Sequence, residues 1–279
     1  MIEPRSWLFV PADSERKIAK ALDSAADAII FDLEDSVAPA QKAAARDILK
    51  NLPARSGGPQ WWVRVNPIGS EFHKDDLEVL GVADIHGVVL PKTEGGADVT
   101  RLAHRTGNIP VHAIVTETAA SLFGLLSYRD PVSPLAAMSW GAEDLSAALG
   151  ASSKYDANGD LAFTYKLART LCLAGAVAAG VQPVDGIFAD FRDDPGLRAE
   201  AEAARREGFT GKLAIHPAQV DVINAAFSPS ETDVRHAAAI VAAFEAQPDA
   251  GVLSVEGRMV DRPHFLQARR TLERASQEN

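Results

Sequence analysis

The stretch that decides the fold is Trp7-Leu8-Phe9-Val10-Pro11-Ala12-Asp13, an apolar run followed by a turn that contains no glycine. Its continuous apolar character predicts a buried strand. A doubly wound open sheet usually carries a Gly-rich turn after its first strand, and no Gly-x-Gly-x-x-Gly pattern is present here. The stretch therefore favours a closed (β/α)₈ barrel, with the doubly wound sheet as the rival.

Seven further apolar runs follow this stretch, separated by amphipathic segments. The eight expected strands are Trp7–Pro11, Ala28–Leu33, Trp61–Val65, Gly87–Leu90, Val111–Thr116, Ala136–Trp140, Asp185–Ala189 and Lys212–Ile215. Most are apolar throughout, as parallel strands covered on both faces are. The expected helices include Ser14–Ala25, Ala38–Leu52, Leu161–Ala179, one opened by Asp194-Pro195, and Thr232–Ala246 after the capping pattern Ser228–Glu231. This alternation of strands and helices predicts a TIM barrel.

The end of the chain has a different pattern. Two short apolar segments, Val252–Val255 and Arg258–Asp261, flank a turn at Glu256-Gly257, and a helix is expected over His264–Arg274. We therefore expect a barrel domain over residues 1–246 and a small C-terminal lid or arm over residues 247–279. The arm either covers the barrel or packs on another subunit.

Composition narrows the classes of partner. The 279 residues include 28 basic and 38 acidic side chains, which gives a net charge of −10. Sequence-independent nucleic-acid binding needs a basic surface, so no nucleic-acid partner is expected. A single cysteine, Cys172, excludes a disulfide framework and a multi-cysteine metal cluster, and its mid-helix position predicts a buried structural thiol. No stretch has the length of a membrane span or a signal segment, so we expect a cytoplasmic protein with no membrane partner.

Ionisable residues gather where the predicted strands end, which is where barrel enzymes place their active sites. These residues are Asp32, Glu34, Asp35, Arg64, Lys92, Glu117, Glu143, Asp144, Asp190 and His216. Mg²⁺ prefers oxygen ligands, commonly one or two carboxylates completed by water and substrate. Glu117 and Asp144 end consecutive strands and fit that need. The alternative is that each carboxylate caps the helix that follows.

The cationic strand ends leave two interpretations open. Arg64 lies in an apolar strand and must find an anion, which is either a carboxylate of the neighbouring strand or a substrate group. For Lys92 an ion pair with an acidic neighbour is favoured. His216 precedes a proline, so a backbone hydrogen bond is favoured there over a role as a base.

A series of motifs resembles a known family. In chain order they are Arg5–Pro11, Phe31–Val37, Val63–Asn66, Leu90–Lys92, Gly141–Leu145 and Ala214–Pro217. Together they resemble the citrate lyase β-subunit-like branch of the HpcH/HpaI aldolase superfamily, which includes malyl-CoA and citramalyl-CoA lyases. The resemblance covers nearly the whole chain and implies a (β/α)₈ barrel and Mg²⁺ dependence, with Mn²⁺ as an alternative ion.

The resemblance also implies roles for residues of the barrel. Glu117 and Asp144 match the metal ligands, and Arg64 matches the arginine that binds substrate and stabilises an enolate. Glu143 lies beside the metal aspartate in the substrate site. Residues that match positions at which related lyases contact substrate CoA are Phe9, Lys20, Ile215 and His216. Ser14 stands where an arginine is common, which departs from the family pattern.

The tail carries a further match. Gly257–Pro263 resembles the family's lid motif, in which an aspartate reaches a neighbouring subunit's active site as acid/base. Asp261 is the matching residue, and the resemblance implies a homo-oligomer, with a trimer favoured. From the residues alone, a cap for the last helix is the favoured interpretation of Asp261.

These features predict a lyase that cleaves or forms a carbon–carbon bond beside a CoA thioester. The expected substrate is a β-hydroxyacyl-CoA such as citramalyl-CoA or malyl-CoA, and the products are a 2-oxo acid (pyruvate or glyoxylate) and acetyl-CoA. The alternatives are the citryl-thioester lyase β subunit of a citrate lyase complex, a malyl-CoA thioesterase, a non-catalytic binding subunit and a CoA-independent pyruvate aldolase.

Overall fold

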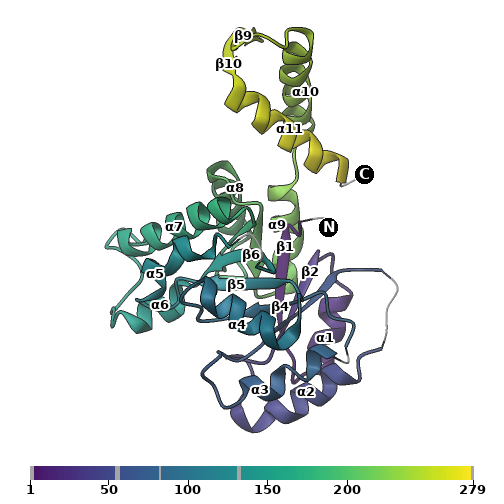
Figure 1. Ribbon diagram of the computed structural model, residues 1–279, viewed down its shortest axis with the longest axis vertical. Helices are drawn as coiled ribbons and strands as arrows, with labels where there is room; N and C mark the ends of the chain where they lie inside the picture. The colour runs from purple at the N-terminus through teal and green to yellow at the C-terminus, as the bar shows by residue number, and fades with distance from the viewer. Residues whose placement is uncertain (1–2, 54–56, 82, 131–132, 278–279) are drawn as a thin grey trace. The chain divides into compact units, whose positions relative to one another are not determined.

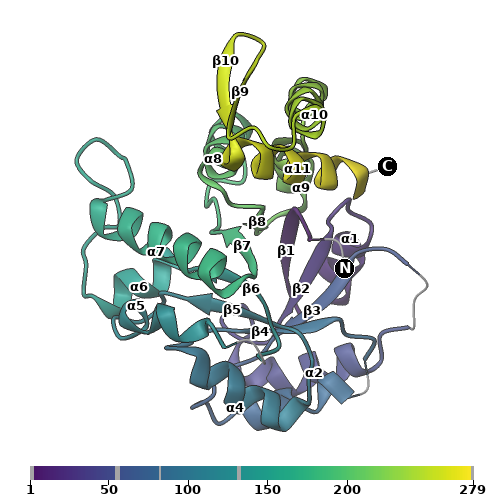
Figure 2. The ribbon, with the colours of Figure 1, turned by 45° about the horizontal axis from the view of Figure 1, so that its top comes forward.

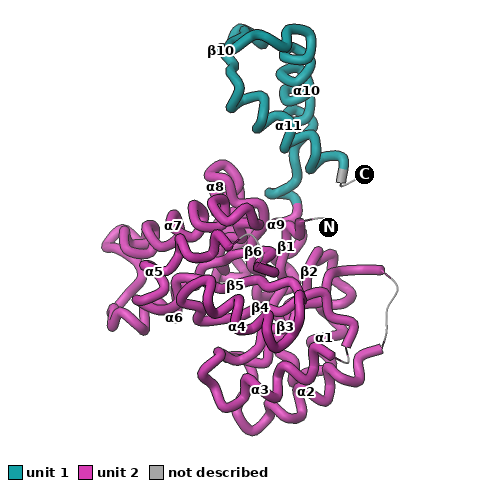
Figure 3. The backbone as a smooth tube through the Cα atoms, in the orientation of Figure 1, with its two compact units in different colours: residues 1–2, 225–279 teal, residues 3–224 magenta. Residues whose placement is uncertain are grey.

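The computed structural model describes residues 3–53, 57–81, 83–130 and 133–277 of the protein. Within these residues the chain forms two compact units, residues 3–224 and residues 225–277, which Figure 3 shows in different colours. The expected ends of the two domains, residues 1–2 and 278–279, lie outside the described residues.

The first unit is a closed barrel of eight parallel strands in the order β1 to β8 (Figure 1). The strands are β1 (Ser6–Pro11), β2 (Ala28–Asp32), β3 (Gln60–Arg64), β4 (Gly87–Leu90), β5 (Val111–Val115), β6 (Leu135–Trp140), β7 (Gln182–Asp185) and β8 (Gly211–Ala214). β1 pairs with both β2 and β8, which closes the ring. The expected TIM barrel is confirmed.

Large side chains from alternating strand positions fill the barrel, as the two-residue repeat of a strand requires. Trp7, Trp62 and Leu213 belong to this core, and the rings of Trp7 and Trp62 lie 4.9 Å apart. His112 is also fully buried, donates or accepts a hydrogen bond with Ser139 Oγ at 2.9 Å and meets Trp7 edge-on. Burial lowers the pKa of His112 to about 3, so this histidine is a neutral core residue.

Helices lie outside the ring of strands (Figure 2). They are α1 (Glu15–Leu22), α2 (Lys42–Lys50), α3 (His73–Asp76), α4 (Gly96–Thr106), α5 (Ser121–Gly124), α6 (Ala142–Ala148), α7 (Phe163–Ala179), α8 (Asp194–Glu207) and α9 (Val220–Phe227), with 3₁₀ turns η1 (Pro39–Gln41), η2 (Val79–Gly81), η3 (Leu125–Tyr128) and η4 (Pro217–Gln219). None of the described helices has the length and apolar character needed to cross a bilayer. Cys172 of α7 is buried, as expected.

Three details differ from the sequence-based expectation. The seventh strand is Gln182–Asp185, not Asp185–Ala189, because the left-handed Gly180 ends α7 and the chain enters the sheet two residues later. Asp193 rather than Asp194 caps α8, since its side chain accepts from Gly196 N. The capping box before α10 joins Ser230 to Asp233, the third residue of that helix.

The second unit contains α10 (Glu231–Ala246), the hairpin of β9 (Val252–Val255) and β10 (Arg258–Asp261), and α11 (Arg262–Gln277). The hairpin turn is formed by Glu256 and Gly257, both with positive φ, which is the expected turn. Ile240 and Phe244 of α10 pack with Val260 and Ala268 in one apolar cluster. The helix α10 therefore belongs with the hairpin, and the units divide at residues 224 and 225 instead of the expected 246 and 247.

Candidate active site

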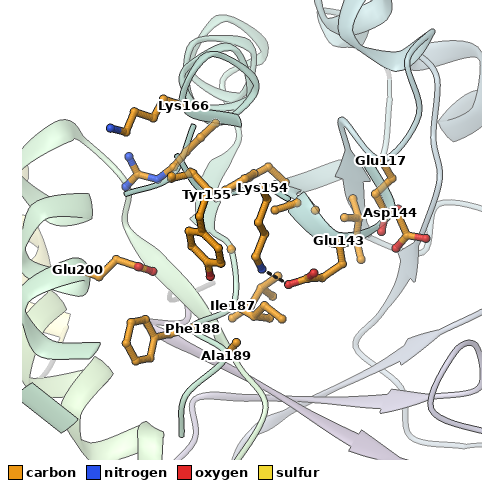
Figure 4. A pocket seen from close by; sticks show the side chains of 18 of the residues that line it. Glu117, Glu143, Asp144, Lys154, Tyr155, Lys166, Ile187, Phe188, Ala189 and Glu200 are labelled. Atoms are coloured by element: carbon orange, nitrogen blue, oxygen red, sulfur yellow. Dashed lines mark hydrogen bonds and ion pairs between the residues drawn. The ribbon is translucent and has the colours of Figure 1, made fainter. Parts of the chain in front are cut away.

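A cavity of about 970 Å³ opens at the carboxyl ends of the barrel strands. It is lined by residues within or after β1, β2, β3, β5, β6, β7 and β8, by the segment between α6 and α7, and by residues of α7 and α8. The predicted site residues Phe9, Arg64, Glu117, Glu143 and Asp144 all line it, and Figure 4 shows the last three with the side chains opposite them.

Glu117 and Asp144 lie at one end of this cavity. Lys92 contacts both: its backbone N–H donates to Glu117 Oε2 at 2.5 Å, and its ammonium lies 3.2 Å from Asp144 Oδ1. Gly141 leaves room for Glu117, because a Cβ at residue 141 would lie only 2.8 Å from Glu117 Cγ. The structure thus brings together the two residues that the sequence singled out on consecutive strands.

The protonation of Glu117 reflects its surroundings. Burial, followed by the negative charge of Asp144, raises the pKa of Glu117 to about 8. Two carboxylates placed this close, one of them fully buried, form a site that favours a cation. Among the described residues no group of three or more His, Cys, Asp or Glu side chains is placed to hold a metal, so these two carboxylates would need substrate and water as further ligands.

The backbone around these carboxylates is strained. Thr116, directly before Glu117, has φ of 69°, and Lys92 has φ of 52°, although both carry a Cβ. Left-handed backbone at a β-branched residue is an outlier that typically costs about 1–3 kcal/mol and tends to occur at functional sites. The hydroxyl of Thr116 is also buried, and no described residue gives it a hydrogen bond. The fold therefore holds the start of the Glu117 segment in a conformation that the local sequence does not favour.

Arg64 pairs with carboxylates at the end of the neighbouring strand, the first of its two interpretations, while contact with a substrate group stays a prediction. Its Nε and Nη2 each donate to the Asp32 carboxylate at 2.7 Å, and Nη1 lies 2.9 Å from Glu34 Oε2. The Phe9 ring lies 4.8 Å from the guanidinium carbon. A guanidinium has five N–H donors, so this pairing fixes the group and leaves two donors beside the cavity.

Lys92 is an ion-pairing residue, as expected. Its ammonium lies 2.5 Å from Glu34 Oε1, 3.4 Å from Asp35 and 3.2 Å from Asp144. Burial would lower the pKa of Lys92, but the hydrogen bond and charge of Glu34 outweigh it and raise that pKa.

Glu143 lies beside Asp144 at the start of α6 and forms an ion pair with Lys154. Lys154 and Tyr155 come from the segment between α6 and α7, and both line the cavity. Neither residue stands out in the sequence, because both lie in a polar connection away from the strand ends.

The remaining predicted residues lie elsewhere. Lys20 is exposed on α1, and His216 stacks on Phe191 at 4.6 Å while its Nδ1 accepts from Ala218 N, which is the favoured backbone hydrogen bond. In the described chain, neither these two residues nor Ile215 lines the cavity.

Asp261 belongs to the second unit, where its Oδ1 lies 2.5 Å from His264 Nδ1. The hydrogen bond from His264 holds the pKa of Asp261 below its usual value. Its side chain therefore caps the first turn of α11.

A buried charge cluster, not foreseen from the sequence, supports another wall of the cavity. Asp185 accepts from Arg169 Nε and Trp140 Nε1, each at 2.8 Å, and from Lys212 Nζ at 2.9 Å. Lys212 is fully buried and also donates to Glu200 at 2.7 Å. Asp185 ends β7, and the misplaced seventh strand had hidden it. The signal that identifies Asp185 is its position directly after the apolar Val184, in the short segment that follows the helix-ending Gly180.

The fold and this site define a TIM-barrel enzyme whose cavity is built around paired carboxylates and a fixed arginine. The chain belongs to the HpcH/HpaI aldolase/citrate lyase family, whose model matches residues 5–217. A second model, described as a C-C bond lyase of the TIM-barrel fold, matches residues 163–277. The chain is accordingly an enzyme of the carbon–carbon lyase class.

Individual relatives cover nearly the full length. A (3S)-malyl-CoA thioesterase of Cereibacter sphaeroides is 40% identical over 277 residues, which is 97% of this chain and 94% of the relative. A citrate lyase subunit beta-like protein of Mycobacterium tuberculosis is 37% identical over 97% of this chain and 95% of its own. The crystal structure of CitE from M. tuberculosis with magnesium, acetoacetate and coenzyme A matches with a TM-score of 0.85 and 37% identity, covering 99% and 98% of the two chains.

Proposed function

We propose that this protein is a Mg²⁺-dependent lyase that cleaves or forms a β-hydroxyacyl-CoA such as citramalyl-CoA or malyl-CoA. The products of cleavage would be a 2-oxo acid, pyruvate or glyoxylate, and acetyl-CoA. The observation that carries the proposal is the pair Glu117 and Asp144 at one end of the cavity, within reach of a single lysine.

The residues present fit a magnesium ion. Glu117 is buried with a raised pKa beside a second carboxylate, which is the arrangement that a divalent cation would relieve. Both donors are oxygens, as Mg²⁺ prefers, and we assign Glu117 and Asp144 as its ligands. When bound, the ion would act as a Lewis acid toward the carboxylate and hydroxyl of the substrate. Mn²⁺ accepts the same donor set.

The chain's own residues account for the remaining steps. Cleavage of the carbon–carbon bond leaves negative charge on the thioester as an enolate, and Arg64 is held by Asp32 and Glu34 with donors to spare. We assign Arg64 to stabilising that charge, an effect typically worth roughly 10²–10³ in rate. Glu143 is assigned to the substrate site because it lines the cavity beside Asp144.

Cleavage removes the proton of the substrate hydroxyl, and the enolate carbon must gain one. We assign both transfers to Asp261 of a neighbouring subunit, whose carboxylate would take the hydroxyl proton and return it to the enolate carbon, supported by the resemblance of Gly257–Pro263 to the family's lid. This assignment requires a homo-oligomer, for which a trimer is favoured. CoA contact by Phe9, Lys20, Ile215 and His216 and a cytoplasmic location stay predictions from the sequence.

The decisive test is a panel of hydroxyacyl-CoAs incubated with the protein and Mg²⁺, with release of 2-oxo acid as the readout. We expect glyoxylate or pyruvate together with an equal amount of acetyl-CoA. Asp144→Ala should abolish the release of 2-oxo acid, and adding Mg²⁺ should no longer stimulate any residual activity. Unchanged turnover and unchanged Mg²⁺ dependence in that variant would refute the metal assignment.

A second candidate function, hydrolysis of malyl-CoA, is favoured by the 40% identity to malyl-CoA thioesterases. Hydrolysis would release free CoA and malate, whereas cleavage releases acetyl-CoA and glyoxylate. Quantifying all four products from malyl-CoA separates the two activities. Turnover of a CoA thioester by the isolated chain would also exclude two of the three remaining alternatives, a citrate lyase complex subunit that depends on partner chains and a non-catalytic subunit. The third, a CoA-independent pyruvate aldolase, would cleave the free hydroxy-keto acid without CoA.

A further inference from the structure

Several cationic side chains line the cavity. They differ in what happens to their carboxylate partner if a ligand binds the cation in its place. Arg64 is paired with Asp32 and Glu34, which are both buried, and Arg169 is paired with the buried Asp185. Removing Arg64 would leave the buried Asp32 without its cation, and removing Arg169 would leave the buried Asp185 with Lys212 alone. Breaking a buried ion pair typically costs several kcal/mol. These two cations are therefore committed to the protein.

Lys154 is in a different position. Its side chain is 16% exposed, but its carboxylate partner Glu143 is 56% exposed. Glu143 can therefore turn to water when another anion takes its place, since an exposed ion pair contributes little. An ammonium also has three donors, so it can serve a ligand carboxylate well.

The segment that carries Lys154 is built to hold it in place. Tyr155 and Leu161 form an antiparallel bridge, and Ala162 N donates to the Lys154 carbonyl at 2.9 Å. The Asp156 side chain accepts from the N–H groups of Asn158 and Asp160, which closes the turn. The Lys154 ammonium lies 5.2 Å from the centre of the Tyr155 ring. Figure 4 shows Lys154 directed at Glu143 across the cavity wall.

The part of the cavity next to Lys154 is acidic, so a ligand carboxylate that binds there needs a cation to pair with. Asp35, Glu117, Glu143 and Asp144 all line this part of the cavity. A ligand with one carboxylate can be held at the metal ligands, but a second carboxylate would face this acidic surface without compensation. Lys154 is a mostly buried cation that can leave Glu143 and pair with this second carboxylate.

We propose that Lys154 is a specificity-determining residue that exchanges Glu143 for a second carboxylate on the acyl group, or on the 2-oxo acid released from it. This inference rests on the proposed lyase function and assigns the residue that would distinguish acyl groups with a carboxylate beyond the one beside the hydroxyl from acyl groups without it. Glu143 then acts as the competitor that the ligand displaces.

The test compares binding of oxaloacetate and pyruvate, which differ by one carboxylate, measured by calorimetry on the full-length protein with Mg²⁺. Lys154→Met should lower the affinity for oxaloacetate about tenfold relative to pyruvate, the equivalent of one lost charge-assisted contact. Lys154→Arg should restore most of the ratio. Lys166→Met, which removes an exposed lysine of the same cavity, is the matched control and should leave the ratio unchanged.

Glu143→Gln gives the sharper result, because it removes the competitor and should raise the oxaloacetate-to-pyruvate affinity ratio. A purely structural ion pair predicts the opposite, since both variants break the same contact and would shift binding in the same direction. An unchanged ratio in Lys154→Met, or a parallel loss in both variants, would overturn the inference. Failure of the wild type to bind either 2-oxo acid would instead count against the proposed function itself.

Discussion

Two groups of charged side chains lie at the carboxyl ends of the strands, and their charges are balanced to different degrees. In the closed cluster of Asp185, Lys212, Arg169 and Glu200, cations surround the central carboxylate. Burial alone would raise the pKa of Asp185, but Lys212 and Arg169 outweigh it and hold that pKa at about 2. At the cavity carboxylates, Glu117 and Asp144, the balance goes the other way and the pKa of Glu117 rises to about 8.

The difference separates a structural from a functional use of the same chemistry. In the closed cluster, the negative charge of Asp185 is balanced by Lys212 and Arg169. Asp185 also accepts a hydrogen bond from Trp140, a residue that lines the cavity. The cavity carboxylates share the Lys92 ammonium with Glu34 and Asp35, so their charge is balanced less completely. Incompletely balanced negative charge facing a cavity is what a cation-dependent site requires. Substitutions in the two groups should therefore affect different properties.

The largest expected effect is on stability. Asp185→Ala removes the buried carboxylate that Lys212 and Arg169 share and leaves them only the half-exposed Glu200 and Glu207, so the free energy of unfolding should fall by about 3–5 kcal/mol. Urea denaturation measures this. Glu200→Ala is the control, because that carboxylate is 44% exposed and should cost under about 1 kcal/mol. Equal losses in the two variants would remove the distinction between the clusters.

Glu117→Gln should affect activity and spare the fold. Loss of a carboxylate from the assigned metal site should lower kcat by roughly 10²–10³, comparable to the loss of a main electrostatic contact. Burial disfavours the charged form of Glu117, so its replacement should not destabilise the fold. With a chelator present to remove metal ions, the melting temperature of the variant should equal or exceed that of the wild type. Asp35→Asn, an exposed cavity carboxylate, is the control and should retain activity. A variant that unfolds would place Glu117 among the structural residues.

The pH dependence of unfolding should report the closed cluster. The pKa of Asp185 is depressed, so its stabilisation is fully present above the usual aspartate pKa of 3.8 and is lost as pH falls toward about 2. The shift is worth about 2 kcal/mol at about 1.4 kcal/mol per pKa unit. Chemical denaturation between pH 2 and 5 should therefore show a shallower acid dependence in Asp185→Asn than in the wild type. Identical slopes would contradict the assignment.

The smallest effect belongs to the residue that joins the two groups. Trp140 donates to Asp185 and is followed directly by Gly141, which packs against Glu117. Trp140→Phe removes one donor from Asp185 while Lys212 and Arg169 remain, so unfolding should cost about 1 kcal/mol less than in the wild type. The urea midpoint measures it. A loss as large as that of Asp185→Ala would mean that Trp140 is the principal partner of the cluster.

Local pattern was sufficient for most of the fold and part of the site. The apolar runs predicted all eight strands, seven of them within a residue or two, because parallel strands buried on both faces leave an uninterrupted signal. The seventh strand was misplaced because Pro183 interrupts it and Ile187 and Phe188 continue the apolar run beyond it. Glu117, Asp144 and Arg64 were found because the carboxyl ends of barrel strands meet in one place.

The sequence by itself determined the barrel, the hairpin and the identity of the paired carboxylates, since these depend on periodicity and on strand order. Only the tertiary structure decided that Lys212 and Arg169 converge on Asp185, that Lys154 faces Glu143, and that Thr116 and Lys92 adopt left-handed backbone. Ion pairs between distant segments and strained dihedrals depend on how whole elements pack, and a residue's neighbours in sequence carry no record of them.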